Sequence, residues 1–229
     1  MKKKNSFWKL LSFLLLALTF SSLTACSKKE KSLLEGKWQD SNGTEITFFP
    51  DKAQAIVEKD GVKTNYKYMT RRDYKFKVYV NRLMQFGMDM GNDYAGEELT
   101  FGTMHMNADG SLFYKMSEGT FTLFGGKGTT VEDLDGLWST KEETGPFAKL
   151  TLDLSKATGE YKLTGYFDQD ELLGEDGIVL EMTGSYRTEA FLSMIFYDEE
   201  KGPDSSQGIE FQQLNGKIIL LDQERFLKK

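Results

Sequence analysis

The chain has 229 residues, with 29 basic and 35 acidic side chains and a formal net charge of −6. This acidic balance argues against nucleic acid as a partner, because phosphate backbones are bound through a basic surface. One histidine and one cysteine are too few for a histidine-rich metal site or a disulfide framework, and a Ser-His-Asp catalytic set is not expected. Abundant aromatic residues and glycine, against three prolines, favour strands joined by tight turns.

Residues 1–25 are expected to be a secretory signal peptide. Four lysines precede an apolar stretch from Leu10 to Phe20, which is shorter than the about 20 residues of a membrane span. The stretch is followed by Leu23-Thr24-Ala25-Cys26, which resembles the lipobox of bacterial lipoproteins. The resemblance implies that Cys26 becomes the mature N-terminus and carries diacylglycerol and palmitate, since two acyl chains or more give a stable anchor. The alternative is an ordinary secretory peptide with an unrelated cysteine.

Residues 26–33 are expected to hold the lipidated cysteine and a short polar tether. Without the four lysines of the signal peptide, 25 basic and 35 acidic residues remain. Because an anionic membrane surface repels an acidic body, we expect the body to stand off the membrane. The expected location is extracytoplasmic, lipid-anchored to the cell membrane at the cell surface, with the outer membrane as the alternative in a Gram-negative host.

Two similar stretches about a hundred positions apart indicate an internal repeat. The matching residues are Leu34, Gly36 and Trp38 in the first stretch and Leu134, Gly136 and Trp138 in the second. Further along, Ile46-Thr47-Phe48 aligns with Leu150-Thr151-Leu152. We therefore predict two tandem units, residues 34–126 and 134–229, joined by a linker at residues 127–133.

Most segments of both units alternate apolar and polar residues with a period of two, which indicates half-buried strands. Val62 to Met69 and Tyr74 to Val80 are predicted as two strands, and the second has lysines on one face only. Leu83 to Met90 is the one candidate for a helical turn, and Asn215-Gly216 predicts a tight hairpin. We expect an all-β fold of two tandem small antiparallel β-barrels or sandwiches.

The motif Gly-x-Trp, followed by a strand meander, resembles the start of a lipocalin-type (calycin) barrel. The resemblance implies that Trp38 and Trp138 close one end of each barrel. It also implies that a basic residue near the last strand packs across each indole, a contact worth about 0.5–2 kcal/mol. On this basis Arg225 is assigned to Trp138, and Lys127 is the weaker counterpart for Trp38. Each unit is shorter than a typical lipocalin, so any barrel is small and side chains are able to fill it.

Four tyrosines on predicted strands are the candidates for lining a ligand pocket or a sugar-binding face. They are Tyr66, Tyr68, Tyr74 and Tyr79. Because aromatic residues on strands more often belong to a core, core packing is the alternative.

Two Met-x-Met pairs resemble extracytoplasmic copper sites, because thioether and imidazole ligands suit Cu(I). The candidate ligands are Met88, Met90, Met104 and Met106. His105 lies between the second pair, but alternate residues of a strand point to opposite faces, which splits the ligand set. Packing of flexible methionines in a core is therefore the favoured alternative.

These patterns together predict a non-enzymatic, membrane-anchored lipoprotein that binds a small apolar or amphipathic ligand in a lipocalin-like manner. The alternative is an interaction module with filled barrels that contacts an envelope or host protein, and copper binding is a remote alternative. An enzyme ranks last, because the chain lacks a recognisable catalytic constellation. No cofactor is expected.

Overall fold

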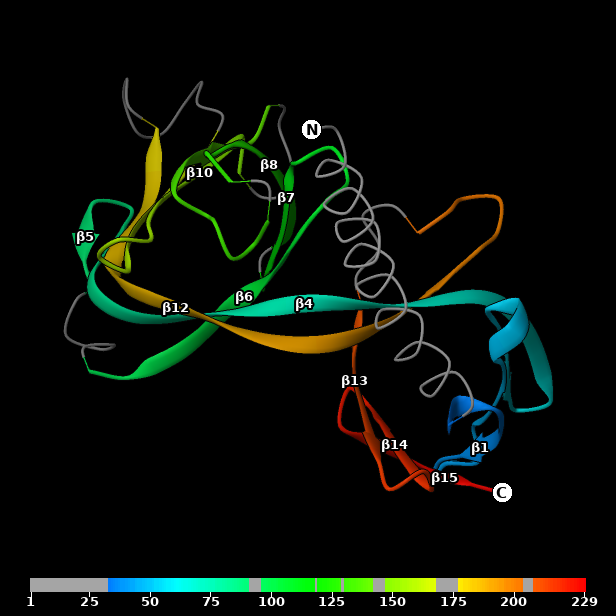
Figure 1. The fold of residues 1–229 in the computed structure, drawn as a ribbon. Coiled ribbons are helices and arrows are strands. Elements are labelled where there is room, and N and C mark those ends of the chain that lie inside the picture. Colours follow the sequence, from blue (N-terminus) through cyan, green and yellow to red (C-terminus); the bar gives the residue numbers. More distant parts are fainter. Residues whose placement is uncertain are drawn as a thin grey trace, which may run out of the picture. The chain divides into compact units, whose positions relative to one another are not determined.

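The computed structural model describes residues 33–90, 96–117, 119–128, 130–141, 147–167, 177–203 and 208–229. The predicted signal peptide, Cys26 and the tether up to Ser32 lie outside these residues. The described chain is almost entirely β-structure, with one short 3-10 helix at Pro50–Lys52 (Figure 1). This confirms the all-β, antiparallel fold class.

Fifteen strands are described. They are β1 (Gly36–Gln39), β2 (Glu45–Phe49), β3 (Gln54–Lys59), β4 (Val62–Gln85), β5 (Met88–Asp89), β6 (Glu98–Met106), β7 (Leu112–Met116), β8 (Gly119–Gly125), β9 (Gly136–Ser139), β10 (Lys149–Ser155), β11 (Glu160–Tyr166), β12 (Ile178–Tyr197), β13 (Ile209–Leu214), β14 (Ile218–Leu221) and β15 (Glu224–Lys228).

Hydrogen bonding closes these strands into rings. Neighbours pair in the order β3-β2-β1-β15-β14-β13-β12-β11-β10-β9-β8-β7-β6-β4-β5, with additional pairings β3–β4 and β12–β4. One closed series of pairings therefore runs through β1, β2, β3, β4, β12, β13, β14 and β15. The other runs through β4, β6, β7, β8, β9, β10, β11 and β12. Closure of this kind satisfies strand edges that would otherwise pair with other chains.

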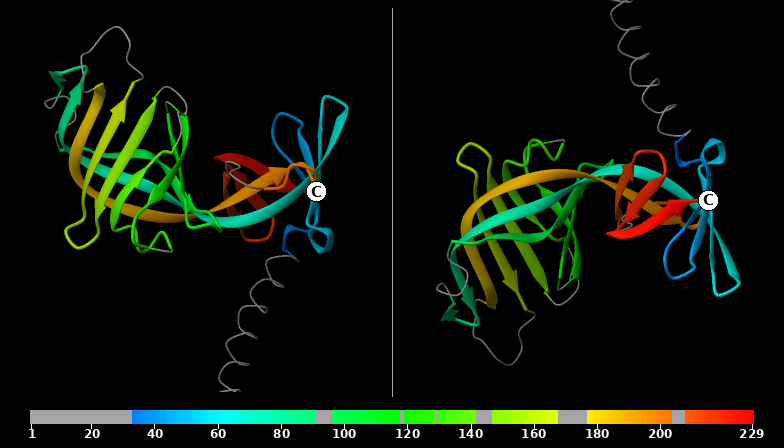
Figure 2. Two further views of the ribbon diagram at one scale, coloured as in Figure 1. Left: turned by 90° about the horizontal axis from the view of Figure 1, so that it is seen from above. Right: turned by 90° about the horizontal axis from the view of Figure 1, so that it is seen from below.

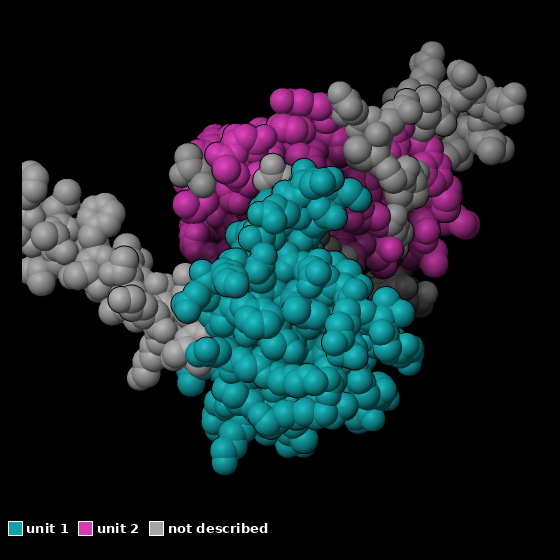
Figure 3. Space-filling model, turned by 90° about the vertical axis from the view of Figure 1, so that its right-hand side faces the viewer, with its two compact units in different colours: residues 1–69, 194–203, 209–229 teal, residues 70–193, 204–208 magenta. Residues whose placement is uncertain are grey.

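Two compact units follow these closed series (Figure 3). Among the described residues, unit 1 comprises 33–69, Met194–Pro203 and Ile209–Lys229, and unit 2 comprises those within Thr70–Ser193 together with Gly208. This division differs from the tandem units that the repeat predicted. The strands β4 and β12 both continue across a unit boundary without a turn. The chain passes from unit 1 to unit 2 along β4, and it returns along β12.

Each unit combines strands from both halves of the chain. Unit 1 combines β1, β2, β3 and the start of β4 with the end of β12, β13, β14 and β15. Unit 2 combines β9, β10, β11 and most of β12 with the rest of β4, β6, β7 and β8. In Figure 2 the blue start of the chain and its red end accordingly lie in one ring, whereas green and yellow strands form the other.

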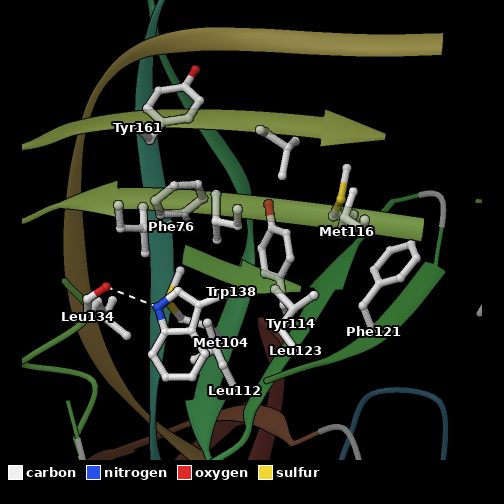
Figure 4. Close-up of a cluster of buried hydrophobic side chains, with 14 of the residues drawn as sticks. Phe76, Met104, Leu112, Tyr114, Met116, Phe121, Leu123, Leu134, Trp138 and Tyr161 are labelled. Atoms are coloured by element: carbon white, nitrogen blue, oxygen red, sulfur yellow. Dashed lines mark hydrogen bonds between the residues drawn. The ribbon is translucent and has the colours of Figure 1, made fainter. Parts of the chain in front are cut away.

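The two repeated tryptophans have matching local settings. Trp38 is fully buried in unit 1, and its indole Nε1 donates a hydrogen bond to the Leu34 carbonyl at 2.8 Å. Trp138 is fully buried in unit 2, and its Nε1 donates to the Leu134 carbonyl at 3.0 Å (Figure 4). The repeated Leu and Trp therefore form the same closed turn at the start of β1 and of β9.

The strand register refines the predicted alignment of the repeats. Trp38 lies opposite Ile46 on β2, and Trp138 lies opposite Leu152 on β10. Ile46 therefore corresponds to Leu152, two positions beyond the predicted match with Leu150. The connection between β9 and β10 is the longer one, and this added length shifts the alignment.

Within β4 the predicted alternation is confirmed. Tyr74, Phe76, Val78 and Val80 are all buried in the core of unit 2, whereas Lys75 and Lys77 between them are not. The predicted break between Met69 and Tyr74 is wrong, because β4 runs through it. Leu83 to Met90 forms the hairpin of β4 and β5 in place of a helical turn.

Candidate binding site at the mouth of unit 2

At one end of unit 2, two connections are longer than their counterparts in unit 1. Residues 140–148 join β9 to β10, whereas residues 40–44 join the matching strands β1 and β2. Residues 167–177 join β11 to β12, whereas residues 60–61 join β3 and β4. We call this end of unit 2 its mouth. The closing turn of Trp138 precedes β9, so the mouth lies at the opposite end of that strand.

Four phenylalanine rings form a continuous chain from the mouth into the core of unit 2. The ring centroids of Phe86 and Phe167 are 6.1 Å apart, and Phe167 stacks on Phe147 at 5.6 Å. Phe147 in turn lies 6.0 Å from Phe121. The exposed fraction falls from 47% at Phe86 to 7% at Phe147 and 0% at Phe121. We call these four residues the aromatic mouth.

The outermost ring of this chain sits on a strained turn. Gln85 pairs with Met88, so Phe86 and Gly87 are the two central residues of the β4–β5 hairpin, with φ of 48° and 76°. This turn normally takes Asn-Gly, because both central residues need positive φ. A bulky aromatic side chain in this conformation costs about 1–3 kcal/mol, and such strain concentrates at binding sites.

A glycine on β11 allows the third ring of the chain to approach the sheet. A Cβ atom at Gly165 would lie 2.9 Å from two ring atoms of Phe147, well inside the normal carbon–carbon contact of about 3.5–4.0 Å. A side chain at this position would therefore displace the Phe147 ring, which lies between Phe121 and Phe167.

Inside unit 2 a large cluster of buried hydrophobic side chains packs together (Figure 4). Phe76 lies at its centre and makes edge-on contacts with Tyr114 at 5.9 Å and Tyr161 at 5.6 Å. The Tyr161 hydroxyl is buried and has no hydrogen-bond partner among the described residues, and burial raises the pKa of Tyr161. A hollow of about 400 Å³ is lined mainly by polar residues of β10, β11 and β12, together with Tyr161 and with Asn81 of β4.

The four predicted tyrosines do not form one pocket. Tyr66 and Tyr68 belong to unit 1, where both rings contact Phe196. Tyr74 and Tyr79 belong to unit 2, but Tyr74 is buried and donates a hydrogen bond to Glu132, whereas Tyr79 is exposed. Three of the four pack against other side chains, as the core alternative expected.

The candidate copper ligands are in different environments. Met104 is 0% exposed in the core of unit 2, whereas Met88 is 62% exposed on β5. His105 stacks on Phe113 at 4.4 Å and points away from the core that holds Met104. In the part of the chain that the structure describes, no three His, Cys, Asp or Glu residues form a metal-binding group. The arrangement therefore gives no support to copper binding.

A buried polar cluster surrounds Asp73 in unit 2. Its carboxylate accepts hydrogen bonds from Arg71 at 2.7 and 3.2 Å and from the buried Ser193 hydroxyl. His105 Nδ1 is 3.8 Å from Asp73 Oδ1, and its Nε2 is 3.1 Å from Asn107 Oδ1. Burial, and then the nearby Arg71 charge, lower the pKa of His105 to about 4.

This cluster brings together a serine, a histidine and an aspartate, which the sequence did not predict. Ser193 donates to Asp73 and not to His105, so the histidine is not placed to activate the hydroxyl. All three side chains are also buried. The arrangement is that of a structural ion pair with its hydrogen bonds satisfied.

The cation that covers an indole is not the predicted one. Lys228 Nζ lies 5.4 Å from the Trp38 ring centroid, whereas Arg225 is exposed on the same strand, β15. Lys127 forms an ion pair with Asp135 at 3.6 Å. The assignments fail because β15 pairs with β1, so the last strand of the chain serves the first tryptophan.

Sequence reasoning missed the aromatic mouth, because its members are far apart in the chain. One local signal was available. Phe86-Gly87 occupies the place of a two-residue turn between alternating strands, and phenylalanine is unusual at the first position of such a turn. None of the described helices is long and apolar enough to span a membrane. Comparison with protein-family models, curated proteins and solved structures gives no match to this chain.

Proposed function

We propose that this protein is an extracytoplasmic lipoprotein, anchored through Cys26, that binds a small apolar or amphipathic ligand at the aromatic mouth of unit 2. The lipobox-like sequence before Cys26 supports the anchor. The chain of four phenylalanine rings supports the binding site. The chain between β9 and β10 and between β11 and β12 is longer than the chain between the corresponding strands of unit 1, which supports unit 2 as the binding unit.

The single observation that carries the proposal is the exposed ring of Phe86 on a strained backbone. Its ring is 47% exposed, and its backbone adopts the left-handed conformation, an arrangement that folding alone does not favour. Full burial of a phenylalanine side chain contributes about 1.5–3 kcal/mol. Covering the exposed half by a ligand would thus contribute about 1 kcal/mol, or about fivefold in affinity.

The surroundings of Phe86 favour an amphipathic ligand. Arg82 on β4 and Asp89 on β5 approach within 4.0 Å beside the Phe86 turn, and both side chains are exposed. Apolar rings with charged groups at their edge are typical of sites that hold an apolar body and orient a polar head.

A substitution pair tests the site. Phe86→Asn removes the ring and supplies a residue that the turn favours, so the variant should be more stable by about 1 kcal/mol. Its affinity for the apolar fluorescent probe N-phenyl-1-naphthylamine should nevertheless fall about fivefold. Phe49→Asn is the matched control, because Phe49 is 39% exposed but belongs to unit 1. Equal probe affinity in both variants and wild type would contradict the proposal.

The filled interior of unit 2 favours a second candidate, an interaction module that contacts an envelope or host protein through the same mouth. A flat contact with a protein would cover Phe86 without admitting a small molecule. Native mass spectrometry of the purified mature protein distinguishes the two. A bound small molecule that is lost in Phe86→Asn supports ligand binding, whereas the absence of any adduct, together with unsaturable probe binding, favours protein contact.

A further inference from the structure

The strand series of the two halves match one another, and the match crosses between the units. Trp38 on β1 lies opposite Lys228 on β15, and Trp138 on β9 lies opposite Gly125 on β8. β8 ends the first half of the chain, and β15 ends the second. Each repeated tryptophan therefore pairs with the last strand of the other half.

The two strands that pass between the units are unusually long. β4 has 24 residues and β12 has 20, whereas ordinary strands have about 3–10. The unit boundaries fall inside them, between Met69 and Thr70 and between Ser193 and Met194. No glycine or proline stands at either crossing, so a half of the chain lacks the turn that it needs to close on itself.

Both units place β4 beside β12. In unit 1 Lys67 pairs with Glu199 at 3.3 Å, and in unit 2 Lys77 pairs with Glu189 at 3.8 Å. A step of ten residues forward on β4 is thus a step of ten residues back on β12, as an antiparallel pair requires. In each unit the ring of strands is completed by the pairing of β4, from the first half of the chain, with β12, from the second half.

The cores are also shared between the halves. In unit 2 Phe76 from the first half packs on Tyr161 from the second, with centroids 5.6 Å apart. In unit 1 Phe48 from the first half lies 6.3 Å from Phe196 of the second. Separating the halves would expose both cores, whereas cutting only the connection between β8 and β9 would break none of these contacts.

We infer that the chain is a fused pair of repeats that exchange their second parts, and that the partner fitted to each half is the other half of this chain. The exchange is the single-chain form of domain swapping, in which identical elements are traded between copies. The covalent link between residues 126 and 135 is then dispensable for the assembled state. The inference rests on the strand pairing and on the contacts between the halves, and it is independent of the proposed ligand.

The test is cleavage of the full mature chain. A protease site replaces Thr129, and the cleaved protein is examined by size-exclusion chromatography with light scattering. We expect the two fragments to co-elute at the mass of the intact chain in a one-to-one ratio. Two native bodies of half the mass, or loss of the strand circular dichroism on cleavage, would overturn the inference.

A second measurement separates exchange from incidental adhesion. The fragments are separated in urea and refolded alone or together. Because each half lacks the turns to close on itself, the mixture alone should regain the intact mass and its cooperative unfolding. A fragment that refolds alone to a stable monomer with native strand content would overturn the inference. A site replacing Ser206, which lies within the second half, controls for damage caused by cleavage itself.

Discussion

Gly126→Ala tests how tightly the closing turn of unit 2 is packed. A Cβ atom at Gly126 would lie 2.1, 2.3 and 2.8 Å from three atoms of the Trp138 ring, against a normal contact of about 3.5–4.0 Å. The ring cannot shift freely, since it is fully buried and its Nε1 bonds the Leu134 carbonyl at 3.0 Å. Overpacking of this kind costs about 1–3 kcal/mol.

The same substitution also carries a backbone cost. Gly126 has a φ of +65°, a conformation that costs an alanine about 1–2 kcal/mol. Gly110 supplies the matched control, because it belongs to the same unit and has a φ of +81°, but a Cβ atom there would meet nothing within 4 Å. Gly110→Ala should therefore lose only about 1–2 kcal/mol, and Gly126→Ala about 2–5 kcal/mol.

The assay is urea unfolding of the mature protein, followed by tryptophan fluorescence and by far-ultraviolet circular dichroism. The comparison of the two alanine variants isolates the packing on Trp138, since the backbone cost is common to both. If Gly126→Ala loses no more stability than Gly110→Ala, the tryptophan is not held in a rigid closing turn, and the matched settings of Trp38 and Trp138 would lose their structural meaning.

Two further predictions concern the anchor and the buried polar cluster. Cys26→Ala should release the protein into the medium or leave it as an unprocessed precursor, because the acyl chains are the expected anchor; a processed, membrane-bound variant in cell fractionation would refute the lipoprotein assignment. His105 has a pKa of about 4 in the fold against 6.5 as its usual value, so the folded state binds fewer protons. Its contribution to stability is complete above pH 6.5 and declines as the pH falls towards 4, with a slope of up to about 1.4 kcal/mol per pH unit. His105→Gln should flatten this decline in urea unfolding measured from pH 7 to 4, and an unchanged slope would contradict the assignment.

Local signals in the sequence were sufficient for the strands themselves. The alternation from Tyr74 to Val80 depends only on neighbouring residues, and the buried face is the predicted one. The recurrence of Leu-x-Gly-x-Trp likewise marks the same turn in both halves of the chain. Period and short motifs are properties of a few consecutive residues, so they can be read without knowledge of the fold.

The exchange of strands between the two halves of the chain could not be predicted from such local signals. Arg71-Arg72-Asp73 reads as a charged break between two strands, yet β4 continues through it. It can do so because Asp73 is buried with hydrogen bonds from Arg71 and Ser193, a partner 120 positions along the chain. The alternation of apolar and polar residues in a strand is the same whether the strand pairs within its own repeat or with strands of the other repeat. The assignment of Arg225 to Trp138 failed for this reason.

The two turns that precede β1 and β9 differ in what covers their tryptophan. Over Trp38 the cover is the charged end of Lys228, whereas Trp138 packs against the bare backbone of Gly126. The connections also differ in length, because residues 60–61 join β3 to β4 in unit 1, whereas residues 167–177 join β11 to β12 in unit 2. The four residues of the proposed binding site all belong to unit 2. A ligand should accordingly protect amides of the β4–β5 hairpin from hydrogen exchange and leave those of unit 1 unchanged.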